Sequence, residues 1–202
     1  MDTSPGRLLI QMSGPPGSGK STMARMLQRS LGGLVIDHDV IRSSLLQDLD
    51  FDRAAKQAYA LQWALAEEAL KQGLNVFVDC VCNYQQVLDH GAALAERHGC
   101  TYWYVECRVD SIDVLDQRLR ARKPMRCQRT SVDVFPDAAQ DQRKGQDPRA
   151  MFTKWMEKPV RPDSNVIIVD SSGSLEDARD HILQSISNTR EAPRASRQHL
   201  CN

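Results

Sequence analysis

The sequence has no surplus of either charge, few aromatic residues and no long apolar run. Its 202 residues include 26 Lys and Arg against 26 Asp and Glu, and aromatic side chains make up 5%. A neutral chain has no overall attraction for nucleic acid or anionic membranes. No apolar run approaches the roughly 20 residues of a membrane span, and the start "MDTSPGRLLIQMSG" lacks the parts of a secretory signal. We therefore expect a cytoplasmic protein without a membrane partner.

The cysteines also lack a pattern that would indicate a metal or a disulfide framework. Six occur, and Cys80 and Cys82 form C-x-C without a matching Cys or His pair at zinc-finger spacing. A chain of this length can bury a core that needs no disulfides. We expect reduced thiols, mostly buried, and no zinc site.

Short apolar runs alternate with helical patterns along the chain. The expected strands are residues 7–13, 34–37, 75–80, 101–109 and 165–170. The expected helices are residues 20–31, 39–49, 52–73, 85–98, 111–122, 149–157 and 174–186. Several strands are continuous apolar runs, which is typical of a parallel sheet covered on both faces. The prediction is an α/β protein with a five-stranded parallel sheet sandwiched between helices.

One domain is expected over residues 1–188, because neither a repeat nor a second pattern of elements occurs. Residues 123–148 carry prolines and charges without a clear period. We interpret them as a long mobile segment and, with the end of the preceding helix, as a lid over about 118–150. Residues 189–202 are expected to form a disordered tail.

The stretch "GPPGSGKST" at 14–22 joins the first strand to the first helix. It fits G-x-x-x-x-G-K-[ST] at Gly14, Gly19, Lys20 and Ser21, the Walker A or P-loop motif. Glycines let backbone N–H groups surround phosphate oxygens, and the helix directs its positive end at the same anion. Lys20 is expected on the β and γ phosphates, and Ser21 on Mg²⁺. The sequence thus predicts a P-loop NTPase fold that binds ATP and Mg²⁺. The expected nucleotide contacts are Gly14, Pro15, Gly17, Ser18, Gly19, Lys20, Ser21 and Thr22.

The fate of the γ-phosphate is the next question. No asparagine is followed by lysine, so the guanine-reading Asn-Lys-x-Asp of switch GTPases is missing. Asp79 ends the third strand, where a Walker B carboxylate belongs, but Cys80 follows it instead of the Glu that activates water in motor-type ATPases. Asp79 is expected to contact the metal or the acceptor; the alternative is a helix cap or turn aspartate.

Transfer to an organic hydroxyl requires a carboxylate near the γ-phosphate. Asp37 and Asp39 follow the second strand, and Arg42 lies three residues after Asp39, on the same face if a helix starts there. We expect Asp39 to act as the base and Asp37 and Arg42 to bind the acceptor. The alternative is that Asp39 caps the helix and Arg42 is a solvated partner.

The run "RLRARKPMRCQR" at 118–129 holds six basic residues and no acidic one. Arg118 and Arg122 are four apart and are expected on one helix face. Arginines here could close over the triphosphate and stabilise charge during transfer. The alternative, stronger for Arg126 and Arg129, is a solvated basic helix end.

Four stretches, "GPPGSGKST", "DHDVIR", "FVDC" and "RLRAR", together resemble the P-loop kinases that include 5′-hydroxyl polynucleotide kinases, chloramphenicol phosphotransferase and zeta toxins. Their order and offsets are most similar to the kinase domain of phage-type polynucleotide kinase. The resemblance covers about residues 7–125 and the final strand. It implies Asp39 as general base, Arg42 on an acceptor phosphate, Arg122 on the donor phosphates and Asp79 as the strand-three aspartate. This group of kinases has diverse acceptors, so the resemblance names no substrate.

The sequence favours an ATP-dependent kinase whose acceptor is a small molecule or nucleotide-like compound bearing a hydroxyl. Lys20, Asp39 and Arg122 are its expected catalytic residues. A 5′-hydroxyl polynucleotide kinase is the second interpretation; the basic run lacks the interleaved aromatics typical of single-strand binders, which makes nucleic acid the less favoured acceptor. A nucleotide-binding regulator without transferase activity is the alternative from another class, but it has no use for Asp39.

Overall fold

Five parallel strands form one sheet in the computed structural model, which describes residues 6–81 and 83–191. The strands are β1 (Leu8–Ser13), β2 (Leu34–Asp37), β3 (Val76–Asp79), β4 (Thr101–Arg108) and β5 (Val166–Asp170). Their order across the sheet is β2-β3-β1-β4-β5, with every neighbouring pair parallel. The expected five-stranded parallel sheet is therefore confirmed, with strand bounds within about one residue of those predicted from the sequence.

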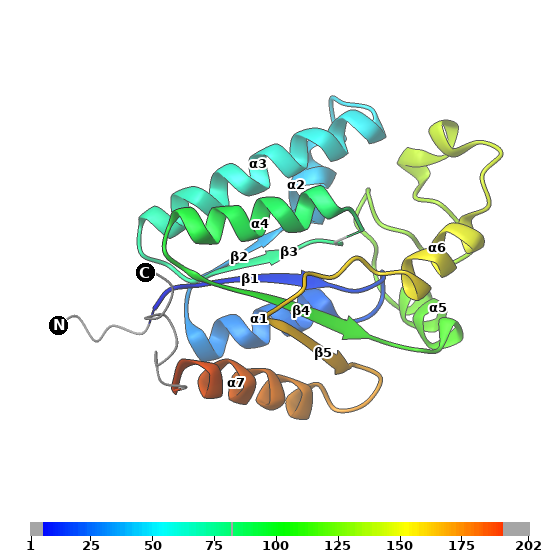
Figure 1. The fold of residues 1–202 in the computed structure, drawn as a ribbon. Coiled ribbons are helices and arrows are strands. Elements are labelled where there is room, and N and C mark those ends of the chain that lie inside the picture. Colours follow the sequence, from blue (N-terminus) through cyan, green and yellow to red (C-terminus); the bar gives the residue numbers. More distant parts are fainter. Residues whose placement is uncertain (1–5, 82, 192–202) are drawn as a thin grey trace, which may run out of the picture.

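Helices cover both faces of the sheet (Figure 1). Two long helices, α3 (Phe51–Lys71) and α4 (Gln85–Arg97), cover one face, while α1 (Lys20–Leu31) and α7 (Leu175–Glu191) cover the other. The remaining helices are α2 (His38–Leu45), α5 (Ile112–Ala121), α6 (Pro148–Glu157) and the short 3₁₀ turns η1 (Asp137–Ala139) and η2 (Asp141–Arg143). The tail from 192 onward and Cys82 lie outside the described residues.

The central strand β1 is buried on both faces, as its continuous apolar sequence predicts. Leu8, Ile10 and Met12 pack with α1 and α7, whereas Leu9 packs with α3 and α4. Alternate residues of a strand point to opposite faces, so each face receives its own apolar set. Burial on both faces fixes the register of β1 and thereby the position of the loop that follows it.

Two helix ends differ from the sequence-based prediction. Helix α2 begins at His38 because the Asp37 carboxylate accepts from the backbone N–H groups of Asp39 and Val40. It ends at Leu45, earlier than the expected residue 49, because residues 46–49 continue in tighter turns. Helix α5 ends at Ala121, and Arg122 has extended backbone angles. The expectation that Arg118 and Arg122 share one helix face is therefore wrong.

Residues 123–147, expected to be irregular, contain only short 3₁₀ turns and one isolated bridge, but they bury side chains against two parts of the domain. Cys127, Phe135 and Ala139 pack with Leu46 and Phe51. Val132 packs with residues of α5 and α6. These two small clusters connect α2 and α3 to α5 and α6 through this segment.

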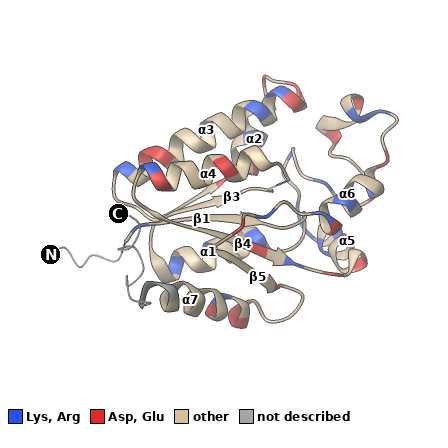
Figure 2. Cartoon of the chain, viewed as in Figure 1, with Lys and Arg blue, Asp and Glu red and all other residues tan. Residues whose placement is uncertain are grey.

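The three described buried cysteines are Cys80, Cys107 and Cys127, and Cys100 is half-buried. All four are free thiols. Acidic and basic residues are interspersed on α3 and α4 (Figure 2). None of the helices in the described ranges is both long and apolar enough to cross a membrane.

A glycine of α4, Gly91, lies directly against side chains of the sheet. The Cβ of an alanine at Gly91 would collide with Gln11 Oε1 and lie 3.2 Å from the Tyr102 ring. Gln11 cannot move freely, because its Nε2 donates to the Val87 carbonyl (3.1 Å) and its Oε1 accepts from the Tyr102 hydroxyl (2.8 Å).

We predict that Gly91→Ala destabilises the protein by about 1–3 kcal/mol through overpacking. The same change in an open helix would stabilise by about 0.5–1 kcal/mol. Urea unfolding measures the difference, and Gly173→Ala, where the new Cβ meets nothing within 4 Å, is the control, expected within about 0.5 kcal/mol of wild type. Stabilisation by Gly91→Ala would show that α4 is not held this closely to β1.

Candidate active site

The P-loop turns sharply at Gly14, directly after β1. Gly14 has φ 132°, and a Cβ there would collide with the Cys107 carbonyl and lie 2.6 Å from Ser18 Oγ. Only glycine fits this position without strain. Pro15 is buried, and its carbonyl accepts from the Ser18 N–H (3.1 Å). The loop is therefore closed by its own backbone and by β4.

The loop ends in a helix N-terminus with free donors. Gly19 is the N-cap of α1, with φ 88°, and no side chain caps the helix. The first N–H groups of α1 therefore have no side-chain acceptor from the cap residue, and such groups bind anions. Ser18 Oγ is buried and has no hydrogen-bond partner among the described residues. Lys20 is buried, Ser21 is half-buried and Thr22 is exposed on α1. A phosphate chain fits these unsatisfied donors.

Asp79 lies beside the loop, buried without a hydrogen bond. Its strand β3 pairs with β1, and Asp79 is opposite Met12, two residues before Gly14. Among the described residues no hydrogen bond of normal geometry reaches either carboxylate oxygen. Burial raises the pKa of Asp79 to about 6, against the opposing effect of Lys20 and with a further rise from Asp37. The Asp79 carboxylate and the nearby Ser21 hydroxyl are oxygen ligands of the kind that fits Mg²⁺, whereas the Lys20 ammonium is a cation and no ligand.

Asp37 and Asp39 lie on the other side of Asp79. Asp37 is opposite Asp79 in the sheet. It caps α2 and forms an ion pair with Arg25 (3.4 Å), and burial, then Asp39, raises its pKa. Asp39 is half-buried, and its Oδ2 accepts from Gln128 Nε2 (2.8 Å). The sequence alternative of Asp39 as the cap is wrong: Asp37 is the cap, which leaves the Asp39 carboxylate available to a ligand.

Two arginines surround Asp39. Arg42 donates to the Phe51 carbonyl (3.0 Å) and stacks on the Phe51 ring (3.7 Å to its centroid), while its Nε has no partner among the described residues. Arg122 donates to the Arg129 carbonyl (3.2 Å). Burial lowers the pKa of both guanidinium groups, and the charge of Asp39 opposes the decrease. The three side chains therefore lie in one electrostatic environment.

Arg118 lies apart from this group. It donates to the carbonyls of Ser171 (2.9 Å) and Gly17 (3.4 Å), and so connects the P-loop to the end of β5. Ser171 Oγ also donates to the Ser18 carbonyl (2.6 Å). Arg118 is thus beside the loop, and its hydrogen bonds to other described residues are with backbone carbonyls.

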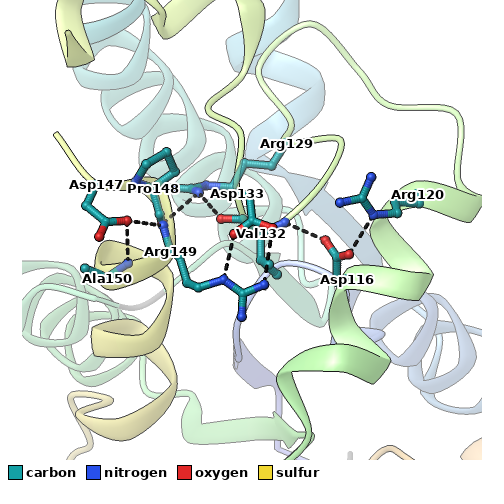
Figure 3. A network of polar contacts seen from close by, with 9 residues as sticks. All are labelled: Asp116, Arg120, Arg129, Val132, Asp133, Asp147, Pro148, Arg149 and Ala150. Carbon is teal, nitrogen blue, oxygen red and sulfur yellow. Dashed lines mark hydrogen bonds and ion pairs between the residues drawn. The ribbon is translucent and has the colours of Figure 1, made fainter. Parts of the chain in front are cut away.

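Arg129 organises the segment that contacts Asp39. It is 4% exposed, and its Nη1 donates to the Val132 and Pro148 carbonyls (Figure 3). Its guanidinium lies near the rings of Phe135 and Trp155, and burial lowers its pKa to about 10. The alternative interpretation of Arg129, a solvated basic helix end, is therefore wrong.

The rest of the network in Figure 3 joins the segment to α5 and α6. Asp116 of α5 accepts from the Val132 N–H (2.8 Å) and pairs with Arg120 (2.6 Å). Asp133 pairs with Arg149 of α6 (2.6 Å). Residues 129–149 are therefore held at both ends, which fixes the carbonyl that Arg122 contacts.

Comparison with known proteins assigns the family. Residues 9–148, more than half of the chain, match the AAA domain family model AAA_33. The chain belongs to this AAA domain family. A search of curated proteins finds no match to it.

Solved structures share the fold of this AAA domain. A candidate kinase from Chloroflexus aurantiacus is 17% identical with a TM-score of 0.66, over 92% of this chain and 98% of that chain. A gluconokinase from Sinorhizobium meliloti 1021 is 19% identical with a TM-score of 0.59, over 93% and 94%. The Mycobacterium tuberculosis APS kinase, in complex with AMPPNP and APS, is 16% identical with a TM-score of 0.57, over 91% and 99%. The fold is that of the P-loop kinases.

Sequence reasoning missed several residues around the site of this AAA domain. Gln128, which donates to Asp39, and Ser171, which supports the P-loop, belong to no motif. His38 is buried, bonds Gln62 and stacks on Tyr59, and burial lowers its pKa to about 4, so it is neutral at pH 7. The one usable signal was the position of His38 between the two aspartates.

The raised pKa of Asp79 predicts that this carboxylate destabilises the ligand-free protein. Its folded pKa, about 6, lies above the ordinary value of 3.8. The folded state therefore holds the proton more tightly, and stability falls as pH rises from about 4 to 6 and stays lower above that. Two pKa units correspond to roughly 3 kcal/mol. Asp79→Asn has no carboxylate to ionise and so does not lose this stability. Its stability relative to wild type should therefore increase between about pH 4 and 6.

Thermal unfolding of both proteins without nucleotide, in a metal chelator, at several pH values measures this advantage. Asp48→Asn makes the same change in an exposed turn and should follow wild type at every pH. A difference between Asp79→Asn and wild type that does not change with pH would contradict the burial account of Asp79.

Proposed function

We propose that this protein is an ATP-dependent kinase that transfers the γ-phosphate to the hydroxyl of a small molecule. The observation that carries the proposal is the Asp39 carboxylate. Asp37 and not Asp39 caps α2, so the Asp39 carboxylate is not used by the helix backbone. It accepts a hydrogen bond from Gln128 and lies close enough to Asp79 to raise the pKa of Asp79, on which Lys20 also acts. A P-loop that only binds nucleotide has no need of a second carboxylate here.

The roles follow from the positions of the side chains. The backbone of the P-loop, the N-terminus of α1 and Lys20 bind the triphosphate. Ser21 and Asp79 are the proposed ligands of Mg²⁺, which would neutralise charge on the phosphates. Asp39 accepts the proton of the acceptor hydroxyl. At the same time the acceptor oxygen bonds to the γ-phosphorus, and the bond between the γ-phosphorus and the leaving ADP oxygen breaks. Arg122 stabilises the negative charge of the transferring group.

The comparisons support a small acceptor. The gluconokinase and the APS kinase that share the fold are named for small substrates. Their identity to this chain is low, so the acceptor itself is inferred from the residues of this protein.

The basic run at 118–129 supports the same preference over a polynucleotide. Arg118 donates to backbone carbonyls, Arg120 pairs with Asp116 and Arg129 is buried. Lys123 and Arg126 are the exposed members outside these contacts. Two exposed charges do not make a basic groove that follows a long polyanion. The region 118–150 remains a proposed lid, because its Gln128 donates to Asp39 and its Arg122 lies within the electrostatic influence of Asp39.

We predict that Asp39→Asn lowers turnover by about 10²-fold or more, the scale of a lost general base. An amide keeps the size and an oxygen for Gln128 but does not accept the proton. ATP affinity should change little. Rapid-quench transfer assays and nucleotide titration measure the two quantities, and Asp48→Asn is the matched control. An equal loss of ATP affinity would make Asp39 a nucleotide or metal ligand, and unchanged turnover would remove its role as a base.

A further inference from the structure

A cavity beside the P-loop is lined by more carboxylates than guanidinium groups. Its volume is about 370 Å³, at the small end of the range of about 300–1,000 Å³ for small-molecule sites. Gly14 and Pro15 of the P-loop form one side of it. The end of β4 and the residues from Trp155 to Arg161 form the other sides. A molecule in this cavity would therefore contact the loop that binds the phosphates.

The cations of the cavity wall are already paired. Arg161 forms two hydrogen bonds with Glu106, Nε to Oε2 (2.7 Å) and Nη2 to Oε1 (2.8 Å). Glu106 is 4% exposed and lies opposite Ser13 in the sheet, immediately before the P-loop. Arg108 pairs with Asp110. Both guanidinium groups of the wall thus have a carboxylate partner.

One further acidic residue lines the cavity, and it has no basic counterpart there. Glu157 is exposed on the last turn of α6. The wall therefore has three carboxylates and two guanidinium groups. An acceptor with a carboxylate or phosphate of its own would meet this excess negative charge, or would compete for the partly exposed Arg161 with the buried Glu106 carboxylate, which is costly to leave without its partner.

The same wall suits hydroxyl groups. The Glu106–Arg161 pair combines carboxylate oxygens that accept with N–H groups that donate, and Asn83 adds an amide. Trp155 is half-buried at the wall, and an aromatic face carries partial negative charge that attracts C–H groups. Donors and acceptors beside one aromatic face match a compound with several hydroxyls on a carbon skeleton.

We infer that this cavity binds the body of the acceptor, while the reacting hydroxyl extends beyond the cavity wall to Asp39. We further infer that the acceptor is an uncharged polyhydroxylated compound, a sugar or polyol without phosphate or carboxylate. This inference rests on the proposed function. It goes beyond that proposal by fixing the charge of the acceptor, and it removes the need for an acceptor anion on Arg42, whose guanidinium already contacts Phe51.

Binding is tested with compounds that differ only in charge. The pairs are D-glucose with D-glucuronate, D-xylose with D-xylonate, and glycerol with D-glycerate. Saturation-transfer NMR on the full chain, loaded with a non-hydrolysable ATP analogue, gives each dissociation constant without turnover. We expect at least one neutral compound to bind about tenfold more tightly than its acid, because like charges at a binding site disfavour the acid.

Two variants connect the preference to the cavity. Glu157→Lys should reduce the neutral-to-acid ratio by about threefold or more, because it reverses the charge excess of the wall. Glu96→Lys makes the same change on the exposed surface near the C-terminal end of α4 and should leave the ratio unchanged. Asn83→Ala should weaken binding of the neutral compound, and it removes no hydrogen bond or ion pair between the described residues.

The possible outcomes of these experiments separate the inference about the cavity from the proposed kinase activity. Tighter binding of the acids, no binding of any neutral compound, or a ratio that Glu157→Lys leaves unchanged would overturn the inference. Phosphoryl transfer to an anionic acceptor would overturn it while leaving the proposed kinase activity intact. Binding of a neutral compound at this cavity without any transfer from ATP would instead contradict the proposed function.

Discussion

The site depends on a buried negative charge, Asp79, kept next to the P-loop by the parallel pairing of β3 with β1. Both of its neighbours in the sheet are fixed, because β1 is buried on both faces and Asp37 caps α2. Asp79 therefore stays buried, and no hydrogen bond of normal geometry reaches its carboxylate oxygens from the described residues. Asp37 pairs with Arg25, and Asp39 lies near Arg42 and Arg122, so Asp79, with Lys20 as its nearby cation, is the carboxylate that is short of positive charge. A divalent cation bound with a nucleotide would supply it, which explains why a folded protein keeps an unpaired carboxylate in this position.

The second constraint is the buried Arg129, which holds the segment after α5 in place. The segment has almost no regular structure, so its position depends on side chains: carbonyls bound by Arg129, the Val132 N–H bound by Asp116, and apolar contacts of Phe135 and Phe152. Arg122 and Gln128, both close to Asp39, are positioned by it. A substitution in the packing around Arg129 would therefore change the surroundings of Asp39, the proposed base, without changing Asp39 itself.

The sequence was sufficient for the sheet and for the P-loop, because both depend on local patterns. Continuous apolar runs identify buried parallel strands, and glycines with lysine at fixed spacing identify the phosphate loop. The end of α5 was not predictable from its period, since Arg122 leaves the helix to reach a carbonyl seven residues later. The burial of Arg129 was not predictable, because its partners from α6, the Pro148 carbonyl and the Trp155 ring, are distant in sequence. The cavity beside Gly14 likewise combines β4 with α6, and only the fold brings them together.

The central claim is that the γ-phosphate goes to an organic hydroxyl and not to water. Phosphorus NMR of wild type with ATP, Mg²⁺ and a mixture of small hydroxyl compounds, both neutral and anionic, tests it most directly, with Lys20→Ala as the inactive control. The account predicts a phosphomonoester signal that appears as the γ-phosphate signal declines, in wild type but not in Lys20→Ala. Inorganic phosphate as the main product in wild type, or a phosphomonoester formed equally well by Lys20→Ala, would contradict it.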